Sequence, residues 1–188
     1  MRADQWLLFG HLIGVLTLFV AIALENLILV FTLRARTVEQ LRSATIFEPL
    51  LPRLFPIGVV LILGFGIGLV AHSGEFKFGQ AWIDLALGLV IVLTIMGPTV
   101  QGRRNDHIRA EARTAPNGPI PAGLAAKVRD PVLRTSVCIS SWLAFSLVFL
   151  MARQPDWAGS WLTIVVFGLI GVSQSLVVSR VTADTLTE

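Results

Sequence analysis

The sequence predicts an all-α protein, a membrane-embedded bundle of five transmembrane helices. Three observations predict this class. The 188-residue chain is 54% hydrophobic and 14% charged, whereas a soluble domain has roughly 45–50% apolar and 25% charged residues. Its apolar residues gather in five runs, each long enough to cross the ~30 Å hydrocarbon core of a bilayer. Its basic residues lie mainly between these runs and raise the formal net charge to +3.

Each apolar run is interpreted as one spanning helix, because about 20 residues at ~1.5 Å per residue cross the bilayer core. The first run has no Lys, Arg or Pro. Residues 72–80 and 153–156 are short connections, so each is expected to join its two spans into an antiparallel hairpin. One lone helix and two helical hairpins then form a single integral membrane domain over residues 1–188. The predicted spans are residues 6–33, 54–71, 81–100, 132–152 and 157–178.

The longest connection, residues 101–131, is expected to be a structured cytoplasmic loop. Its first half is rich in charge, TAPNGPIPAG interrupts any helix there, and LAAKVRDP resumes a helical pattern. Asp130 before Pro131 is predicted to cap the fourth span, because aspartate suits the N-cap and proline suits the first helical turn. Upstream, Gly97-Pro98 is predicted to kink or end the third span.

Basic residues also predict the orientation. Twelve Lys and Arg residues lie after the first span, in the long loop and in the C-terminal tail, against three on the other side. Positive charge is enriched on the cytoplasmic side, so the N-terminus is expected outside and the C-terminus inside a bacterial cytoplasmic (inner) membrane. The expected partners are anionic lipid headgroups at the Arg-rich loops, and also other membrane proteins or a second copy of the chain. No nucleic-acid partner is expected.

Histidines near the outer side of the bundle are candidate ligands. An ionisable residue within a span is by default a candidate for function. His11 lies in the outer half of the first span, and Asp84 comes at a similar depth in the third span, so the two are expected to form a pair that orients the imidazole. His72 would supply a second axial ligand for a b-type haem. Alternatively, His11 makes an interhelical hydrogen bond and Asp84 reaches the headgroups.

Polar residues also lie in the inner half of the bundle. His11, Leu18 and Glu25 are seven residues apart, so they share one stripe that is expected to face the bundle. By depth, Gln174 of the fifth span is opposite Glu25 and Asn26, and these three residues form a predicted intramembrane polar node. A carboxyl group there must be protonated or meet several donors. A proton or cation site and a structural hydrogen-bond node both stay open.

Small residues predict close helix contacts. Gly64 and Gly68 are four residues apart in the second span, and Gly168, Gly171 and Ser175 form a comparable face on the fifth span. GxSxG, HExxH, Walker and Cys/His metal-binding patterns are absent from the sequence. No catalytic residue, metal or enzyme activity is therefore assigned.

Three segments carry a family resemblance. FGHLIGVLTLF near the start, FGQAWIDLALGLVIVL after the glycine-rich second span, and DPVLRTSVCISSWLAFSLVFLMARQPD near the end together resemble small bacterial integral membrane proteins of unknown function. That group is distantly similar to the copper-resistance D membrane domain and to the membrane-bound haem-containing protoporphyrinogen oxidase. Both have a histidine early in the first span, so the resemblance implies His11 as a candidate ligand.

Three functions follow from these observations. The small-residue faces and the absence of a catalytic motif favour an accessory or scaffold subunit, which acts through helix packing with other membrane proteins. The first alternative is a haem- or metal-binding membrane redox protein centred on His11. The second alternative is a small proton-coupled transporter that uses Glu25.

Overall fold

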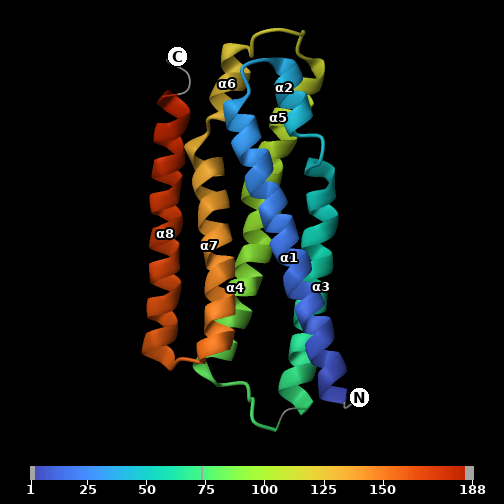
Figure 1. Ribbon diagram of the computed structural model, residues 1–188, viewed down its shortest axis with the longest axis vertical. Coiled ribbons are helices and arrows are strands. Elements are labelled where there is room, and N and C mark those ends of the chain that lie inside the picture. Colours follow the sequence, from blue (N-terminus) through green and yellow to red (C-terminus); the bar gives the residue numbers. More distant parts are fainter. Residues whose placement is uncertain (1–2, 73, 185–188) are drawn as a thin grey trace.

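The computed structural model describes residues 3–72 and 74–184 and is an all-α bundle (Figure 1). Five helices are apolar and long enough to cross a membrane, and the described residues form no β-strand. The predicted bundle of five spans is therefore confirmed. The long helices are α1 (Ala3–Arg34), α3 (Leu51–His72), α4 (Ala81–Met96), α7 (Pro131–Arg153) and α8 (Trp157–Asp184).

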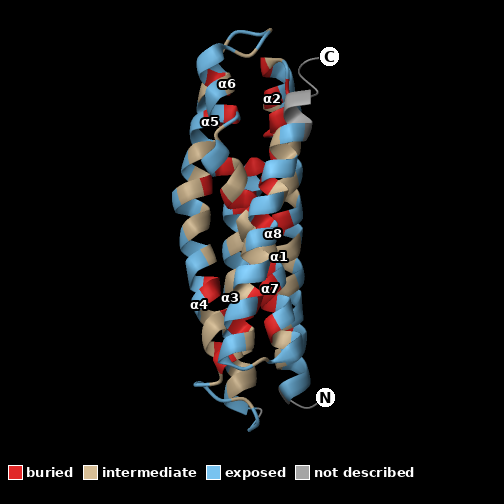
Figure 2. Ribbon diagram, turned by 90° about the vertical axis from the view of Figure 1, so that its left-hand side faces the viewer, coloured by how far each residue is buried: buried red, intermediate tan, exposed pale blue. Residues whose placement is uncertain are grey.

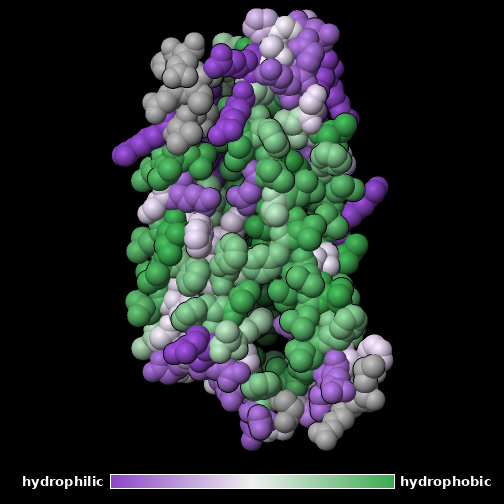
Figure 3. Space-filling view, in the orientation of Figure 1, coloured by the Kyte–Doolittle hydropathy of each residue, from purple (hydrophilic) through white to green (hydrophobic). Residues whose placement is uncertain are grey.

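Polar and apolar surfaces separate along the bundle axis. Three short helices, α2 (Val38–Ala44), α5 (Arg103–Thr114) and α6 (Ala122–Val128), gather at the end where α1 and α8 finish (Figure 1). We call these helices and residues 115–121 the polar cap. On the face shown in Figure 3, hydrophobic side chains cover most of the middle of the molecule, and hydrophilic ones gather at both ends. This banded surface is the one that a bilayer requires.

The first helix belongs to neither predicted hairpin, but it does not stand alone in space. α1 packs along α3 more extensively than any other two helices pack. Glycines on both helices let the backbones approach. A Cβ on Gly14 would lie 2.8 Å from the backbone nitrogen of Ile62, and one on Gly58 would lie 3.1 Å from that of Leu18. The α7–α8 hairpin is the second closely packed pair, whereas α3 and α4 are neighbours in sequence with few contacts in space.

Three of the five predicted packing residues lie in these contacts. A Cβ on Gly68 would lie 2.9 Å from Leu7, and one on Gly171 would lie 2.7 Å from the Cα of Ile139. Ser175 is buried, and its hydroxyl lies 2.7 Å from that of Thr135 on α7. These residues hold α1 against α3 and α7 against α8.

Gly64 and Gly168 depart from the expectation, because no atom lies within 4 Å of the position that a Cβ would take on either. On α3, the stripe that faces α1 includes Ile62, and Gly64 is two residues further, about 200° around the helix. Near Gly168, the aromatic rings of Phe167 and Trp142 fill the space between α7 and α8, with centroids 6.1 Å apart. The four-residue spacing of small residues in the sequence therefore does not show which face of each helix contacts its neighbour.

The third span continues into the polar cap without a turn. α4 ends at Met96, as the Gly97-Pro98 pair predicts, and a π-helical segment, η2 (Gly97–Gly102), leads into α5. Pro98 has no N–H to donate to the carbonyl four residues earlier, and a π-helical segment accommodates such an interruption. Charged α5 is therefore held in line with the apolar helix that precedes it.

Arg42 fastens the polar cap. Its guanidinium group donates to the carbonyl oxygens of Ala112 (2.8 Å) and Ala115 (2.6 Å) and to the side-chain oxygen of Asn117 (2.8 Å). The first two bonds satisfy carbonyls at the end of α5 that lack a helical partner. Buried apolar side chains of the cap join those of the spans in one hydrophobic core, and buried positions follow the axis up into the cap (Figure 2). The cap is thus packed onto the bundle.

Asp130 caps α7 as predicted. Its Oδ1 accepts from the backbone N–H of Val132 at 2.8 Å, and its Oδ2 accepts from Arg104 of α5 at 2.8 Å. The same carboxylate therefore starts the fourth span and ties it to the polar cap.

Candidate functional site

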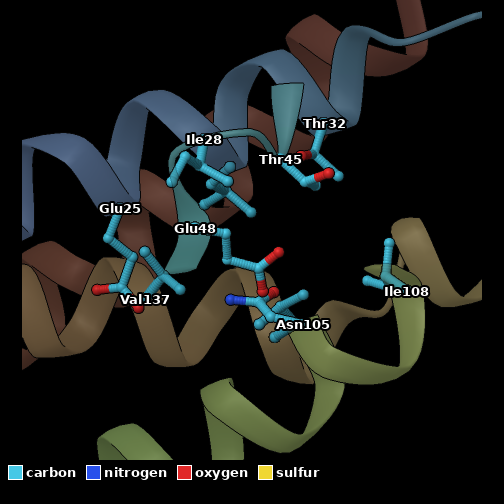
Figure 4. Close-up of a pocket in the computed structure, with 10 residues that line it drawn as sticks. Glu25, Ile28, Thr32, Thr45, Glu48, Asn105, Ile108 and Val137 are labelled. Carbon is cyan, nitrogen blue, oxygen red and sulfur yellow. The ribbon is translucent and has the colours of Figure 1, made fainter. Parts of the chain in front are cut away.

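A pocket lies where α1, α5, α7 and the short 3-10 helix η1 (Glu48–Leu50) meet, directly below the polar cap (Figure 4). Its empty volume is about 340 Å³, which includes space open to the outside. The enclosed part has room for about one water molecule. Aliphatic side chains make up half of the lining, and the polar lining residues are Glu25, Thr32, Thr45, Glu48 and Asn105.

One face of α1 supplies the first carboxyl group. Glu25, Ile28, Leu29 and Thr32 line the pocket, and their spacing of three, four and seven residues places them on one side of a helix. Glu25 is only 5% exposed, and no described residue forms a hydrogen bond with its carboxyl group. A buried carboxyl group without a partner is destabilising, so this position needs an explanation beyond packing.

The second carboxyl group comes from the connection between α2 and α3. Thr45 ends α2 and donates both its N–H and its hydroxyl to the carbonyl of Leu41 at 3.1 Å. Ile46 and Phe47 are exposed, and Glu48 turns inward and is 5% exposed. In Figure 4 the Glu48 side chain points into the pocket beside Asn105, and Glu25 enters from α1 next to Val137.

Two buried oxygen atoms in this pocket have no hydrogen-bond partner among the described residues, Oε2 of Glu48 and Oγ1 of Thr32. Each such atom costs about 1–3 kcal/mol of folding free energy. Natural proteins bury few unsatisfied polar groups, and those that occur often serve a function. The polar lining is therefore a candidate binding site and not a completed hydrogen-bond network.

Glu48 and Thr32 were not predicted from the sequence, and one signal points to each of them in retrospect. It interrupts the apolar stretch IFEPLLP, which contains no basic residue, so the carboxyl group has no nearby partner in sequence. Thr32 extends the seven-residue series of His11, Leu18 and Glu25 along the stripe of α1 that faces inward. The stripe that predicts Glu25 thus also contains the hydroxyl group that lies in the same pocket.

The predicted node of Glu25, Asn26 and Gln174 is divided in the structure. Asn26 donates from Nδ2 to the carbonyl of Ile22 and to the hydroxyl of Ser141, both at 2.8 Å. Gln174 accepts from the indole N–H of Trp142 at 2.7 Å. Both partners, Ser141 and Trp142, belong to α7, so Asn26 and Gln174 contact different sides of that helix, and neither satisfies Glu25.

The predicted pair of His11 and Asp84 is not brought together either. Nδ1 of His11 lies 3.1 Å from the carbonyl oxygen of Ile62 on α3. Asp84 instead accepts from the backbone N–H of Gly79, in the loop before α4, at 3.1 Å. His11 therefore matches the alternative interpretation, an interhelical hydrogen bond, and Asp84 holds the α3–α4 loop.

His11 and His72 do not fit as the two axial ligands of one haem. His11 lies at the level of Gly66, whose Cβ would be 3.1 Å from its Nδ1. His72 is six residues further along α3, about 9 Å along the axis, and its Nδ1 lies 3.0 Å from the carbonyl of Gly68 on its own helix. Axial ligands must reach the same iron from opposite sides. In the described part of the chain, no cluster of three or more His, Cys, Asp or Glu is suited to a metal ion.

The fold and the site together define a multi-pass membrane protein with a carboxyl-lined pocket inside its helical bundle. No family model matches the chain, and no curated protein or solved structure matches it.

Proposed function

We propose that the protein is a small proton-coupled transporter whose proton-binding site is the pair Glu25 and Glu48. One observation carries the proposal: two carboxyl side chains from separate elements, each 5% exposed, line the same pocket. No Lys, Arg or His is among the described lining residues. Burial disfavours the charged form of each carboxyl group. At Glu48, outside the spans, burial outweighs the favourable charges of Arg109 and Arg113 and raises the pKa to about 7, so this group holds a proton that can be exchanged.

The basic residues of the polar cap indicate the side of the membrane from which protons reach this site. The pocket lies at the end of the bundle that carries the Arg-rich polar cap. We place this end in the cytoplasm of a bacterial cell and the spans in its cytoplasmic membrane, because basic residues are enriched on the cytoplasmic side. The basic residues of the cap would then bind anionic lipid headgroups. Protons would enter or leave Glu48 from the cytoplasmic side of the membrane.

The accessory-subunit hypothesis draws less support from the structure. It depended on small-residue faces, and three of their five residues, Gly68, Gly171 and Ser175, pack against helices of this chain. Internal packing thus accounts for these residues without a partner protein, but it does not account for two buried carboxyl groups. An accessory role with other membrane proteins, or with a second copy of the chain, stays a prediction.

The test is proton flux into proteoliposomes that contain the purified chain. With a membrane potential imposed and a pH-sensitive dye inside, the wild type is expected to conduct protons well above empty liposomes. Glu25→Gln and Glu48→Gln keep the side-chain shape but cannot exchange a proton, and each is expected to lower the flux at least about tenfold.

Glu75→Gln is the matched control, because Glu75 is exposed in the loop between α3 and α4. Its flux is expected to equal that of the wild type. Wild-type flux at the level of empty liposomes, or undiminished flux in both pocket variants, would contradict the proposed function.

A further inference from the structure

The chemistry of the Glu25–Glu48 pocket limits what else it can bind. Its polar lining offers carboxylate, hydroxyl and amide groups from Glu25, Thr32, Thr45, Glu48 and Asn105. Among the described lining residues there is no imidazole, thiol or basic group. Oxygen ligands suit hard cations, whereas the common transition metals favour nitrogen and sulfur. Beyond the lining, Arg109 and Arg113 of α5 act on Glu48 by their positive charge, and Asp106 opposes them. An anion inside the pocket would meet the carboxyl groups without a basic side chain in the lining.

The unsatisfied oxygens show where a cation would lie. Oε2 of Glu48 and Oγ1 of Thr32 are buried without a hydrogen-bond partner in the described chain. A proton on Glu48 would satisfy one carboxyl oxygen and leave the Thr32 hydroxyl unsatisfied. A metal cation between the two can accept electron pairs from both oxygens at once. The Thr45 hydroxyl already donates its hydrogen to the Leu41 carbonyl at 3.1 Å, so its oxygen keeps lone pairs for the same ion.

Size and charge narrow the cation further. The enclosed space holds about one water molecule, so an organic cation or a hydrated ion does not fit. The ion must enter without its water shell, and Mg²⁺ releases its waters reluctantly. The pocket has two carboxyl groups, and no third His, Cys, Asp or Glu joins them in the described chain to form a metal cluster. A small monovalent ion and one ionised carboxyl group together carry no net charge. Such an ion also loses less hydration free energy on entering the pocket than a divalent ion does.

We infer that the Glu25–Glu48 pocket also binds a sodium ion at Glu48, which competes with protons for that carboxyl group. The inference rests on the proposed proton site and adds a second substrate class to it. Glu48 and Thr32 supply the unsatisfied oxygens, Thr45 adds a hydroxyl oxygen, and binding of either cation at Glu48 excludes the other. Glu25 is two helical turns from Thr32 on α1, about 10 Å along the axis, and is not a ligand of this ion.

Direct binding of radioactive sodium to the purified full-length chain in detergent tests this inference, with choline chloride holding the ionic strength constant. We expect saturable binding that weakens as the pH falls, because protons occupy the same oxygens. Unlabelled Na⁺ is expected to displace the bound radioactive sodium, and choline is not. Thr32→Val is expected to lower the affinity about tenfold, the loss of one oxygen ligand. Thr32→Ser restores the oxygen and is expected to bind as the wild type does.

Thr17→Val is the matched control on the same helix, because the Thr17 hydroxyl bonds only to the carbonyl of Ile13 at 2.8 Å. It is expected to bind sodium like the wild type. As a second measurement, Na⁺ is expected to raise the thermal midpoint of the wild type, since a ligand that binds the folded state stabilises it. Proton flux without saturable sodium binding or sodium-dependent stabilisation would overturn the inference and leave the proton site standing. Absence of both flux and binding would overturn both.

Discussion

Replacing Glu48 with methionine is expected to stabilise the folded bundle by about 1–3 kcal/mol and to abolish proton-coupled transport. The carboxyl group is 5% exposed and one of its oxygens has no partner among the described residues. Methionine is flexible and apolar, so it fills the same space among Ile28, Ile108 and Val137 and leaves no unsatisfied oxygen. A group that lowers stability where it stands is typical of a functional site.

The measurement is the thermal midpoint in detergent, followed by tryptophan fluorescence, together with proton flux in proteoliposomes. Glu48→Gln is the control, because the amide is as polar as the carboxyl group and is expected to remove the flux without raising the midpoint. If Glu48→Met lowers the midpoint, Glu48 is a structural hydrogen-bond residue, and the interpretation of the pocket as a binding site is wrong.

Replacing Gly14 with leucine is expected to destabilise the bundle by about 3 kcal/mol or more, because it overpacks the contact between α1 and α3. Even a Cβ at this position would lie 2.8 Å from both the backbone nitrogen of Ile62 and the Cβ of Leu61. The backbone of α3 cannot yield as a side chain does, so the two helices must separate. A lower thermal midpoint and increased cleavage by protease in detergent would show this separation.

Gly64→Leu is the matched control in the same helix pair. No atom lies within 4 Å of its Cβ position, so the added side chain enters the lipid and the midpoint is expected to stay unchanged. A Gly14→Leu midpoint as high as that of the wild type would contradict the assignment of the α1–α3 contact. Equal losses in both variants would indicate that Gly64 also meets a neighbouring helix in the bilayer.

The spans could be predicted from the sequence because the length and hydropathy of a span depend only on the residues within it. A run without charges that is long enough to cross the bilayer has few alternatives. The capping of α7 by Asp130 and the end of α4 before Gly97-Pro98 follow from local backbone chemistry in the same way. The stripe of α1 that contains Glu25 follows from helical periodicity alone.

Partners across the bundle could not be predicted, because depth along the axis does not fix direction around it. Gln174 was expected opposite Glu25 by depth, yet it bonds to Trp142 on α7. Gly64 was expected at a contact by spacing, yet it faces open space, and Gly14 of α1 lies in the contact instead. Glu48 could not be identified as a site residue, because its burial depends on how the connection after α2 folds back under the polar cap.

Infrared difference spectroscopy of the lipid-reconstituted protein, recorded while the pH is changed, tests the shared proton site most directly. A protonated carboxyl group has a C=O stretching band that disappears when the proton leaves. The proposed site predicts such a band in the wild type and in Glu75→Gln, and its loss in both Glu25→Gln and Glu48→Gln. Spectra that are identical in the wild type and the two pocket variants would contradict the claim that Glu25 and Glu48 hold the exchangeable protons.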